Sequence, residues 1–230
     1  DAAGLAVAGK MESQLRGINM SIRNAQDGMG LIQTAESGLN EIRNMVLRIR
    51  ELAVQMANGI YENTPDRSNA QLEVTALIDQ VTLIAENTRF NDIAVLDGSF
   101  TGVSIQTGNT TAETITLSFI DVASSGLSID TATVATQSDA TVAMGTMDTA
   151  LQTIASEQAK FGSLINRLNF SVANQSKASV MTEQAIGRVL DADFATETTN
   201  LSKQQILNQA ATSMLAQANQ SKQSILALLQ

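Results

Sequence analysis

Residues able to do nucleophilic or metal chemistry are scarce in this chain of 230 residues, which has no cysteine and no histidine. It therefore lacks a thiolate nucleophile, a serine–histidine–aspartate triad and the usual ligands of a zinc site. Asp191 and Asp193 form a paired-carboxylate motif, but no base or third ligand accompanies them in the sequence. We interpret the pair as a turn that leads into a helix, and we expect no enzyme activity, no metal and no cofactor.

The charge balance argues against two classes of partner. Lysine and arginine number 14 and the acidic residues 23, which gives a net charge of −9. That charge opposes binding to nucleic acid or to an anionic membrane surface. No apolar run reaches the roughly 20 residues of a membrane span. A single proline permits very long helices.

The first long element is predicted over residues 5–57, where apolar residues recur in alternating steps of four and three. Such a stripe is typical of an amphipathic helix packed lengthwise on other helices. A repeated step of three at Ile32 to Ala35 resembles a coiled-coil stammer. The stripe consists of Met11, Leu15, Ile18, Ile22, Ala25, Met29, Ile32, Ala35, Leu39, Ile42, Val46, Ile49, Ala53 and Met56. Glycines inside it mark kinks or close approaches, and they are Gly17, Gly28, Gly30 and Gly38.

A second helix is predicted to follow a stop signal at Asn58-Gly59. Thr64 and Pro65 have the residue types of an N-cap and a first helical position, and the helix should end near Asn87. Its expected buried stripe is Leu72, Thr75, Ile78, Val81 and Ala85.

Residues 88–138 change character and predict a β-hairpin-rich insert. Residues 115–119 alternate apolar and polar side chains, as a half-buried strand does. Residues 103–105 are a second candidate strand, and Gly108-Asn109 is the candidate turn between the two. Two or three short hairpins fit here, and no separate large core is expected.

The helical period returns from about Asp139 and continues in steps of four and three from Met147 to Val189. The stripe is apolar as far as Val172 and polar at Gln175, Ser179 and Thr182. That half of the helix is either weakly held or packed on a polar partner. A break is predicted at 191–193, after which Thr196 or Thr199 caps a last helix. Its apolar end, 225–229, requires a partner.

Several motifs in order resemble those of bacterial flagellins. At the N-terminal side they are 1–6 (DAAGLA), 16–19 (RGIN), 23–28 (RNAQDG), 31–36 (LIQTAE), 50–55 (RELAVQ), 87–91 (NTRFN) and 96–98 (LDG). At the C-terminal side they are 191–197 (DADFATE), 205–207 (QIL) and 215–220 (LAQANQ). Roughly residues 1–100 and 160–230 are covered, and so many ordered motifs form a specific signal.

The resemblance implies a mainly α fold: a long antiparallel helical rod or coiled-coil bundle with a small central β-hairpin region. The implied domains are the N-terminal D1-like helices at 1–87, the insert at 88–138, the C-terminal D1-like helix at 139–190 and a D0-like helix at 191–230. We expect a segment that precedes Asp1 in flagellins, and that pairs with the C-terminal helix, to be missing from this chain.

The resemblance also implies a function. A flagellin is exported unfolded through the flagellar type III channel and polymerises outside the cell, under a cap, into a helical filament for swimming. The expected partners are further copies of the chain, the cap and hook-associated proteins, and a cytoplasmic export chaperone. Amphipathic ends that neighbouring subunits complete agree with this reading, because a head-to-tail interface that does not close generates helical filaments.

One surface resembles the region by which animal Toll-like receptor 5 senses flagellins. Arg48, Leu52 and Glu73 match receptor-contacting positions, and Arg50, Glu51 and Gln55 belong to the same patch. Arg48 and Leu52 are four residues apart, which predicts a shared helix face. The alternative is a solvated patch, or one that packs against the next subunit, and the subunit contact is compatible with receptor binding to monomers.

The C-terminal segment resembles the part of flagellin that the export chaperone holds. The implied helix-in-groove anchors are Leu207, Ala211, Met214, Leu215, Ala218, Ile225 and Leu228. In the filament the same helix is expected to line the inner tube. The alternatives for the whole chain are a hook–filament junction protein, a non-polymerising coiled-coil adaptor or signalling rod, and a hydrolase that uses carboxylates alone.

Overall fold

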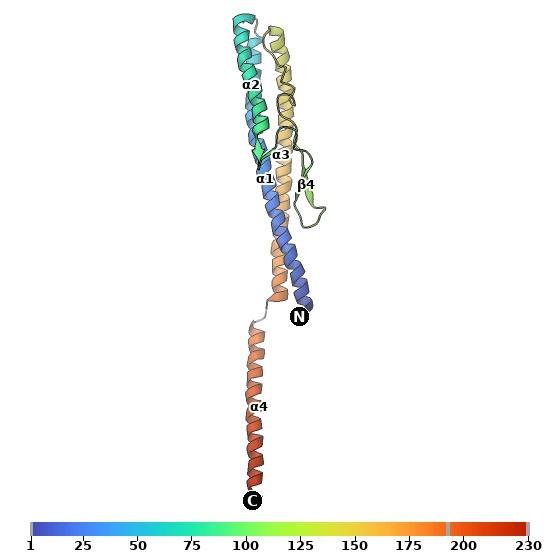
Figure 1. The fold of residues 1–230 in the computed structure, drawn as a ribbon, viewed down its shortest axis with the longest axis vertical. Helices are drawn as coiled ribbons and strands as arrows, with labels where there is room; N and C mark the ends of the chain where they lie inside the picture. Colours follow the sequence, from blue (N-terminus) through green and yellow to red (C-terminus); the bar gives the residue numbers. More distant parts are fainter. Residues whose placement is uncertain (1, 192–193, 229–230) are drawn as a thin grey trace. The chain divides into compact units, whose positions relative to one another are not determined.

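The computed structural model describes residues 2–191 and 194–228. Helices α1 (Ala2–Met56), α2 (Ser68–Asn87), α3 (Gln137–Leu190) and α4 (Phe194–Leu228) form most of the chain. Two antiparallel strand pairs follow α2 and precede α3 in the chain, and the pair that includes β4 lies beside α3 (Figure 1). Residues 12–183 form one compact unit, and the two terminal segments that flank it form another. The mainly α fold with a small β region, expected from the sequence, is confirmed.

Helix α1 buries the apolar stripe that its sequence predicts. From Ile32 to Met56 each stripe residue is buried, and the repeated step between Ile32 and Ala35 does not interrupt the buried row. Toward the N-terminus the burial weakens, because Met11, Leu15 and Ile22 are half-buried. The helix ends at Met56, just before the Asn58-Gly59 signal.

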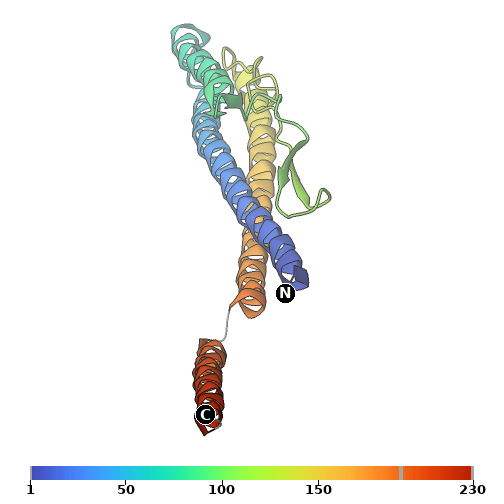
Figure 2. The same cartoon turned by 60° about the horizontal axis from the view of Figure 1, so that its bottom comes forward.

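Helix α3 runs antiparallel to α1 in one constant register. The side chains of Arg50 and Asp148, of Asn40 and Gln158, and of Asn19 and Ser179 are hydrogen-bonded across the two helices. Between successive pairs α1 retreats by as many residues as α3 advances, so the seam does not slip. Figures 1 and 2 show the two helices side by side from both directions. The antiparallel rod is thereby confirmed.

Helix α2 differs from its prediction at its start and on its face. Thr64 has an extended backbone within the short π-helical turn η1 (Asn63–Arg67), so the regular helix begins only at Ser68. The buried residues are Val74, Ile78, Val81 and Ala85. The predicted stripe was wrong for Leu72 and Thr75, which are exposed. The buried row from Val74 to Ala85 keeps steps of four and three, whereas the predicted row began with three successive steps of three.

The two strand pairs are short. β1 (Arg89–Phe90) pairs with β2 (Ile93–Ala94), and β3 (Val103–Gln106) pairs with β4 (Thr114–Leu117). In the second pair Val103 lies opposite Leu117 and Gln106 opposite Thr114, around the predicted Gly108-Asn109 turn. The insert has no core of its own: Phe119 stacks on Phe100 and meets Phe161 of α3 edge-on, at ring distances of 4.8 and 4.7 Å.

The β3–β4 hairpin is seated on both α1 and α3. Asn24 of α1 donates to the Gln106 carbonyl at 3.2 Å, and Gln175 of α3 donates to the Thr107 carbonyl at 3.1 Å. A Cβ added at Gly17 would stand 1.8 Å from the Asn109 Oδ1 at the hairpin tip. The glycine therefore marks a close approach. The polar half of the α3 stripe thus packs on a polar partner, which was the second of the two expectations.

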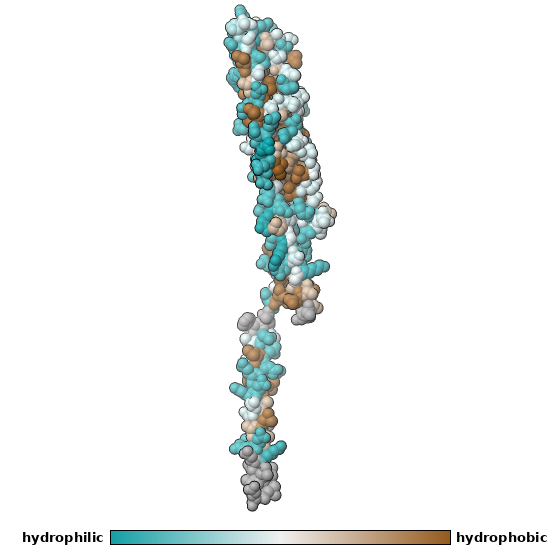
Figure 3. All heavy atoms as spheres, in the orientation of Figure 1, coloured by the Kyte–Doolittle hydropathy of each residue, from teal (hydrophilic) through white to brown (hydrophobic). Residues whose placement is uncertain are grey.

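Helix α4 begins at Phe194, so Thr196 and Thr199 lie within its first turns, and the expectation that either is the N-cap was wrong. Every described side chain from 196 to 222 is exposed. The exposed large apolar residues are Leu201, Ile206, Leu207, Met214 and Leu215, and Figure 3 shows brown atoms among teal ones along this helix.

Candidate functional site

The predicted surface patch lies where α1 runs beside α2. Arg48 Nε donates to Glu73 Oε1 at 2.9 Å, and Arg48 Nη1 donates to Glu51 Oε2 at 3.4 Å. The hydrogen bond to Glu73 and then that to Glu51 raise the pKa of the Arg48 guanidinium above its ordinary value. The structure thus brings together three of the six predicted patch residues, with a cation held between two exposed carboxylates.

Arg50 faces α3 instead. Its Nε donates to Asp148 Oδ1 at 2.5 Å and its Nη2 to Asp148 Oδ2 at 3.4 Å. This two-pronged hydrogen bond is the largest cause of the raised pKa of Arg50, followed by the charge of Asp148. Residues two apart on a helix do not share a face, so Arg48 and Arg50 join α1 to different neighbours.

Leu52 does not lie on the solvent-accessible patch. Its side chain is only 4% exposed and belongs to the hydrophobic core, although it lies one turn from the exposed Arg48. Leu52 stands beside Ala53 of the buried stripe, and the helix rotates it inward. Gln55 is exposed, and its Nε2 donates to the Tyr61 hydroxyl at 3.3 Å. The accessible patch is therefore formed by Arg48, Glu51, Glu73, Arg50 and Gln55.

Two partners of the patch were not found from the sequence. Asp148 and Tyr61 satisfy Arg50 and Gln55. Asp148 directly follows Met147 of the α3 stripe, and the antiparallel register would have placed it opposite Arg50. Asp148 could have been found from the sequence only if the register between α1 and α3, which are far apart in the chain, had been known.

Arg67 is a buried cation at the end of α1. Only 3% of the residue is exposed, and its guanidinium donates to the carbonyls of Met56 at 2.8 Å and Asn58 at 2.9 Å. It also donates to Asn63 Oδ1 at 3.0 Å and to the Tyr61 carbonyl. Carbonyl groups at a helix C-terminus lack intrahelical donors and attract cations. Arg67 therefore caps α1 and fixes the turn that leads to α2.

Glu157 is a buried anion on the inner face of α3. It is 1% exposed, and Lys160 Nζ lies 2.8 Å from its Oε2. Among the described residues no hydrogen-bond partner reaches its Oε1. The sequence placed Gln158 on the buried stripe, whereas Gln158 is half-buried and binds Asn40 at the edge. Ile154 and Phe161 on either side are buried as predicted, so Glu157 takes the inner position at this level in place of Gln158.

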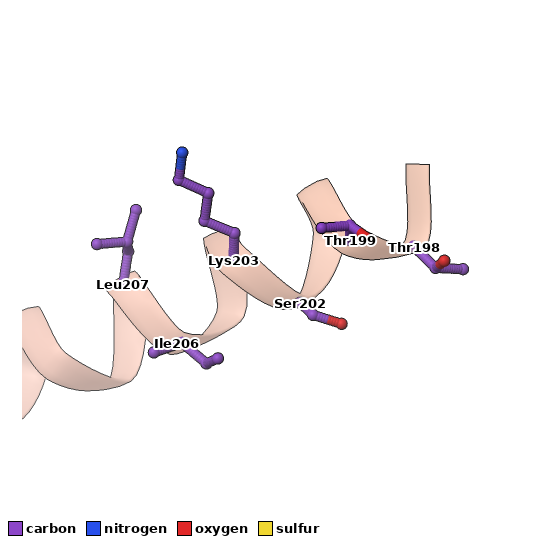
Figure 4. Close-up of a pocket in the computed structure, with 6 residues that line it drawn as sticks. All are labelled: Thr198, Thr199, Ser202, Lys203, Ile206 and Leu207. Carbon is purple, nitrogen blue, oxygen red and sulfur yellow. The ribbon is translucent and has the colours of Figure 1, made fainter. Parts of the chain in front are cut away.

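One hollow of the surface is formed by a single helix. Figure 4 shows it, and its lining residues all come from α4: Thr198, Thr199, Ser202, Lys203, Ile206 and Leu207. No group of three acidic side chains that could hold a metal ion occurs among the described residues. Within the same residues no helix is long and apolar enough to cross a membrane.

The predicted chaperone anchors lie along α4. Leu207, Met214 and Leu215 are exposed, as are Ala211 and Ala218 between and beyond them. The side chains of Ile225 and Leu228 lie outside the part that the structure describes, and so does Asp193 of the paired carboxylates. The described anchors therefore present apolar atoms that no other described segment covers.

Two protein-family models match the chain. The model of the bacterial flagellin N-terminal helical region covers residues 1–101, and that of the bacterial flagellin C-terminal helical region covers residues 144–229. The flagellar filament 31.3 kDa core protein of Treponema maltophilum is 39% identical over 247 residues, which span 100% of this chain and 86% of that protein.

Two solved structures resemble the fold. Bacillus cereus flagellin superposes with a TM-score of 0.60 and 35% identity, covering 66% of this chain and 88% of that one. A putative flagellar hook-associated protein from Vibrio parahaemolyticus has a TM-score of 0.67 at 12% identity, covering 82% and 98%. At that identity the second likeness concerns the fold alone.

Proposed function

This chain belongs to the bacterial flagellin family, and from that membership we propose the parts that its surfaces play in the flagellum. It is a structural subunit that polymerises with copies of itself into the extracellular flagellar filament, which serves motility. The junction-protein and adaptor-rod alternatives are not favoured, because the relative matched across the whole chain is a filament core protein.

The subunit acts without catalysis. Flagellin relatives are structural proteins, and the sequence has neither cysteine nor histidine to supply a nucleophile or a base. The chain needs no cofactor.

Complementation in cells tests the structural role directly. The full-length gene, expressed in a bacterium that lacks its own flagellin, should restore filaments and swimming. Cells that stay bald although the protein is made would contradict it.

Helix α4 has two successive partners. During export, a cytoplasmic chaperone holds its apolar side chains, and in the filament the same helix lines the inner tube. The observation that supports this is the exposure of Leu207, Met214 and Leu215 on a helix with no described cover. Such a surface is unfavourable in water and is typical of a docking segment. The chain leaves the cell unfolded, and cap and hook-associated proteins border the polymer outside.

Chaperone binding can be measured with matched variants of α4. Met214→Glu places a charge on a predicted anchor, whereas Gln209→Glu adds the same charge at an exposed polar position. We expect the first to weaken binding to the export chaperone at least about tenfold and the second to change it little. Equal affinities for the two variants would remove Met214 from the docking surface.

The patch around Arg48 is a binding site for Toll-like receptor 5 on the monomer. Its support is the exposed cluster of Arg48, Glu51 and Glu73, with Arg50 and Gln55 on the adjoining faces. Leu52 contributes as a buried support of α1 and makes no direct contact. Arg48→Ala should reduce receptor signalling about tenfold, while Arg43→Ala, an exposed arginine elsewhere on α1, should not. Equal signalling by both variants would remove the patch from the receptor site.

A further inference from the structure

Helix α2 carries a second stripe on the face away from the core. Its residues recur in steps of four and three and are all exposed: Leu72, Ala76, Asp79, Leu83 and Glu86. The leucines are 72% and 49% exposed, although the buried face of the same helix is already complete. A row of leucines and acids in water, with the spacing of a coiled-coil seam, has the pattern of a helix that receives another helix.

Helix α3 carries a matching outer stripe in its C-terminal half. Its members are again all exposed and are Arg167, Phe170, Asn174, Lys177 and Met181. Phe170 is 77% exposed and Met181 is 69% exposed, while Leu168 of the inner face is fully buried. The second stripe has the same alternating spacing and two large apolar residues like the first, but it carries basic residues in place of acidic ones.

The two stripes are complementary when the helices run in the same direction. With Leu72 set beside Phe170, Ala76 faces Asn174, Asp79 faces Lys177 and Leu83 faces Met181. Two apolar pairs and one acid–base pair thus fall on opposing seam positions. Both helices run antiparallel to α1, so copies that point the same way would present them in parallel.

The stripes cannot meet within one copy. Glu73 of α2 is level with Arg48 of α1, whereas a Cβ added at Gly28 of α1 would contact Leu168 of α3. The levels differ by the 20 residues between positions 28 and 48, which is about 30 Å along a helix. A second copy displaced along the rod by that distance brings the two stripes side by side.

The charge distribution agrees with this arrangement. Between Glu51 and Glu157 the only basic residues of the sequence are Arg67 and Arg89. Acidic residues also outnumber the α1 arginines that lie at this level, Arg43, Arg48 and Arg50, so the α2 end of the rod is acidic. The α3 stripe lies in a segment that carries basic residues instead. Two α2 ends therefore repel each other. A staggered arrangement that sets an α2 end beside the α3 stripe of another copy is favoured.

We propose that the outer stripe of α2 in one subunit packs in parallel on the outer stripe of α3 in a neighbouring subunit displaced by about 30 Å. The contact joins two different surfaces and does not close on itself, so it continues from copy to copy. The proposal rests on the filament function and specifies one interface of that filament.

Engineered cysteines test the pairing, because these 230 residues contain none. Leu83→Cys and Met181→Cys are combined in the full-length protein, filaments are grown, and the thiols are oxidised. We expect a ladder of covalent oligomers on a non-reducing gel. The matched control combines Leu83→Cys with Val180→Cys, an exposed position one residue away on the helix, and should give little cross-linking. Filaments without a ladder, or equal ladders from both variants, overturn the pairing.

A charge exchange provides the second measurement. Asp79→Lys and Lys177→Asp should each slow seeded growth about tenfold, and the combined variant should recover most of the rate. Lack of recovery overturns the Asp79–Lys177 contact. Growth of the unmodified full-length protein is scored first. Its failure counts against the filament function itself, whereas defects confined to the variants concern the stripes.

Discussion

Gly38 of α1 lies against Thr88 at the end of α2, so closely that a Cβ at position 38 would stand 2.7 Å from Thr88 Oγ1. The same Cβ would lie 2.8 Å from a methyl carbon of Leu96, which is fully buried. Thr88 Oγ1 is itself held by the Ile84 carbonyl at 2.6 Å. The glycine therefore permits α1, α2 and the insert to meet at one level.

Gly38→Ala should destabilise the protein by about 1–3 kcal/mol, because the neighbours of the added methyl are short or buried and cannot move aside. The matched control is Gly162→Ala on α3, where an added Cβ meets nothing within 4 Å. There the helix propensity of alanine should stabilise the protein by about 0.5–1 kcal/mol. Denaturant unfolding of both variants measures the difference. The same sign for the two substitutions would contradict the close packing at Gly38.

Glu157→Leu should raise the free energy of unfolding by about 1 kcal/mol or more. One oxygen of the buried carboxylate has no partner within the part of the chain that the structure describes, and the ion pair with Lys160 reaches only the other oxygen. Lys160 is half exposed and can return to water when the carboxylate is removed. The midpoint of urea unfolding is the measurement. A lower midpoint would mean that Glu157 has an additional stabilising partner.

Arg67→Lys should destabilise the turn after α1 by about 2–3 kcal/mol. Lysine keeps the charge but lacks the planar fork that reaches the carbonyls of Met56, Tyr61 and Asn58 together. Hydrogen exchange should accelerate in residues 57–67 before it does elsewhere. Arg89→Lys, at an exposed arginine with one hydrogen bond to the Asp92 carbonyl, is the control and should change little. Equal exchange in both variants would show that the capping role is unimportant.

Asp97 contributes a stabilisation that depends on pH. The hydroxyl and then the backbone N–H of Ser99 donate to its carboxylate and lower the pKa of Asp97 below its ordinary value of 3.8. Because the folded-state pKa is the lower one, the stabilisation is present above pH 3.8 and is lost as the pH falls through the folded value. Asp97→Asn should lower the melting temperature slightly at pH 7. The gap in melting temperature between variant and parent should narrow as the pH falls below 3.8. If the gap in melting temperature stays constant with pH, the lost stability does not come from the charge of Asp97.

The sequence was most informative where a helix has a single apolar face and that face is buried within the chain. The alternating stripe from Ile32 to Met56 and the hairpin around Gly108-Asn109 were predicted and are present. The pattern misled at Leu72, an apolar residue assigned to the core that is 72% exposed. Helix α2 is apolar on two faces, and spacing alone does not distinguish a face buried within the chain from one that other copies could cover.

The candidate site was predictable in part for a similar reason. Arg48 and Glu73 were placed in one patch and form an ion pair. Leu52 was placed there too, because residues four apart share a face, but this position lies at the border of the core and is buried. Asp148 and Arg67 were missed because their partners come from distant or irregular segments, whose offset no local pattern reveals.

Seeded assembly tests the central claim most directly. The full-length protein and a variant without α4 (Phe194–Leu228) are added to short filament seeds, and growth is followed by sedimentation and electron microscopy. Circular dichroism first establishes that the helices of residues 12–183 remain folded in the truncated variant. The full-length protein should extend the seeds while the truncated variant stays in solution. If the full-length protein does not grow filaments, or the variant without α4 grows them equally well, the assignment of a filament subunit completed through its terminal helix is wrong.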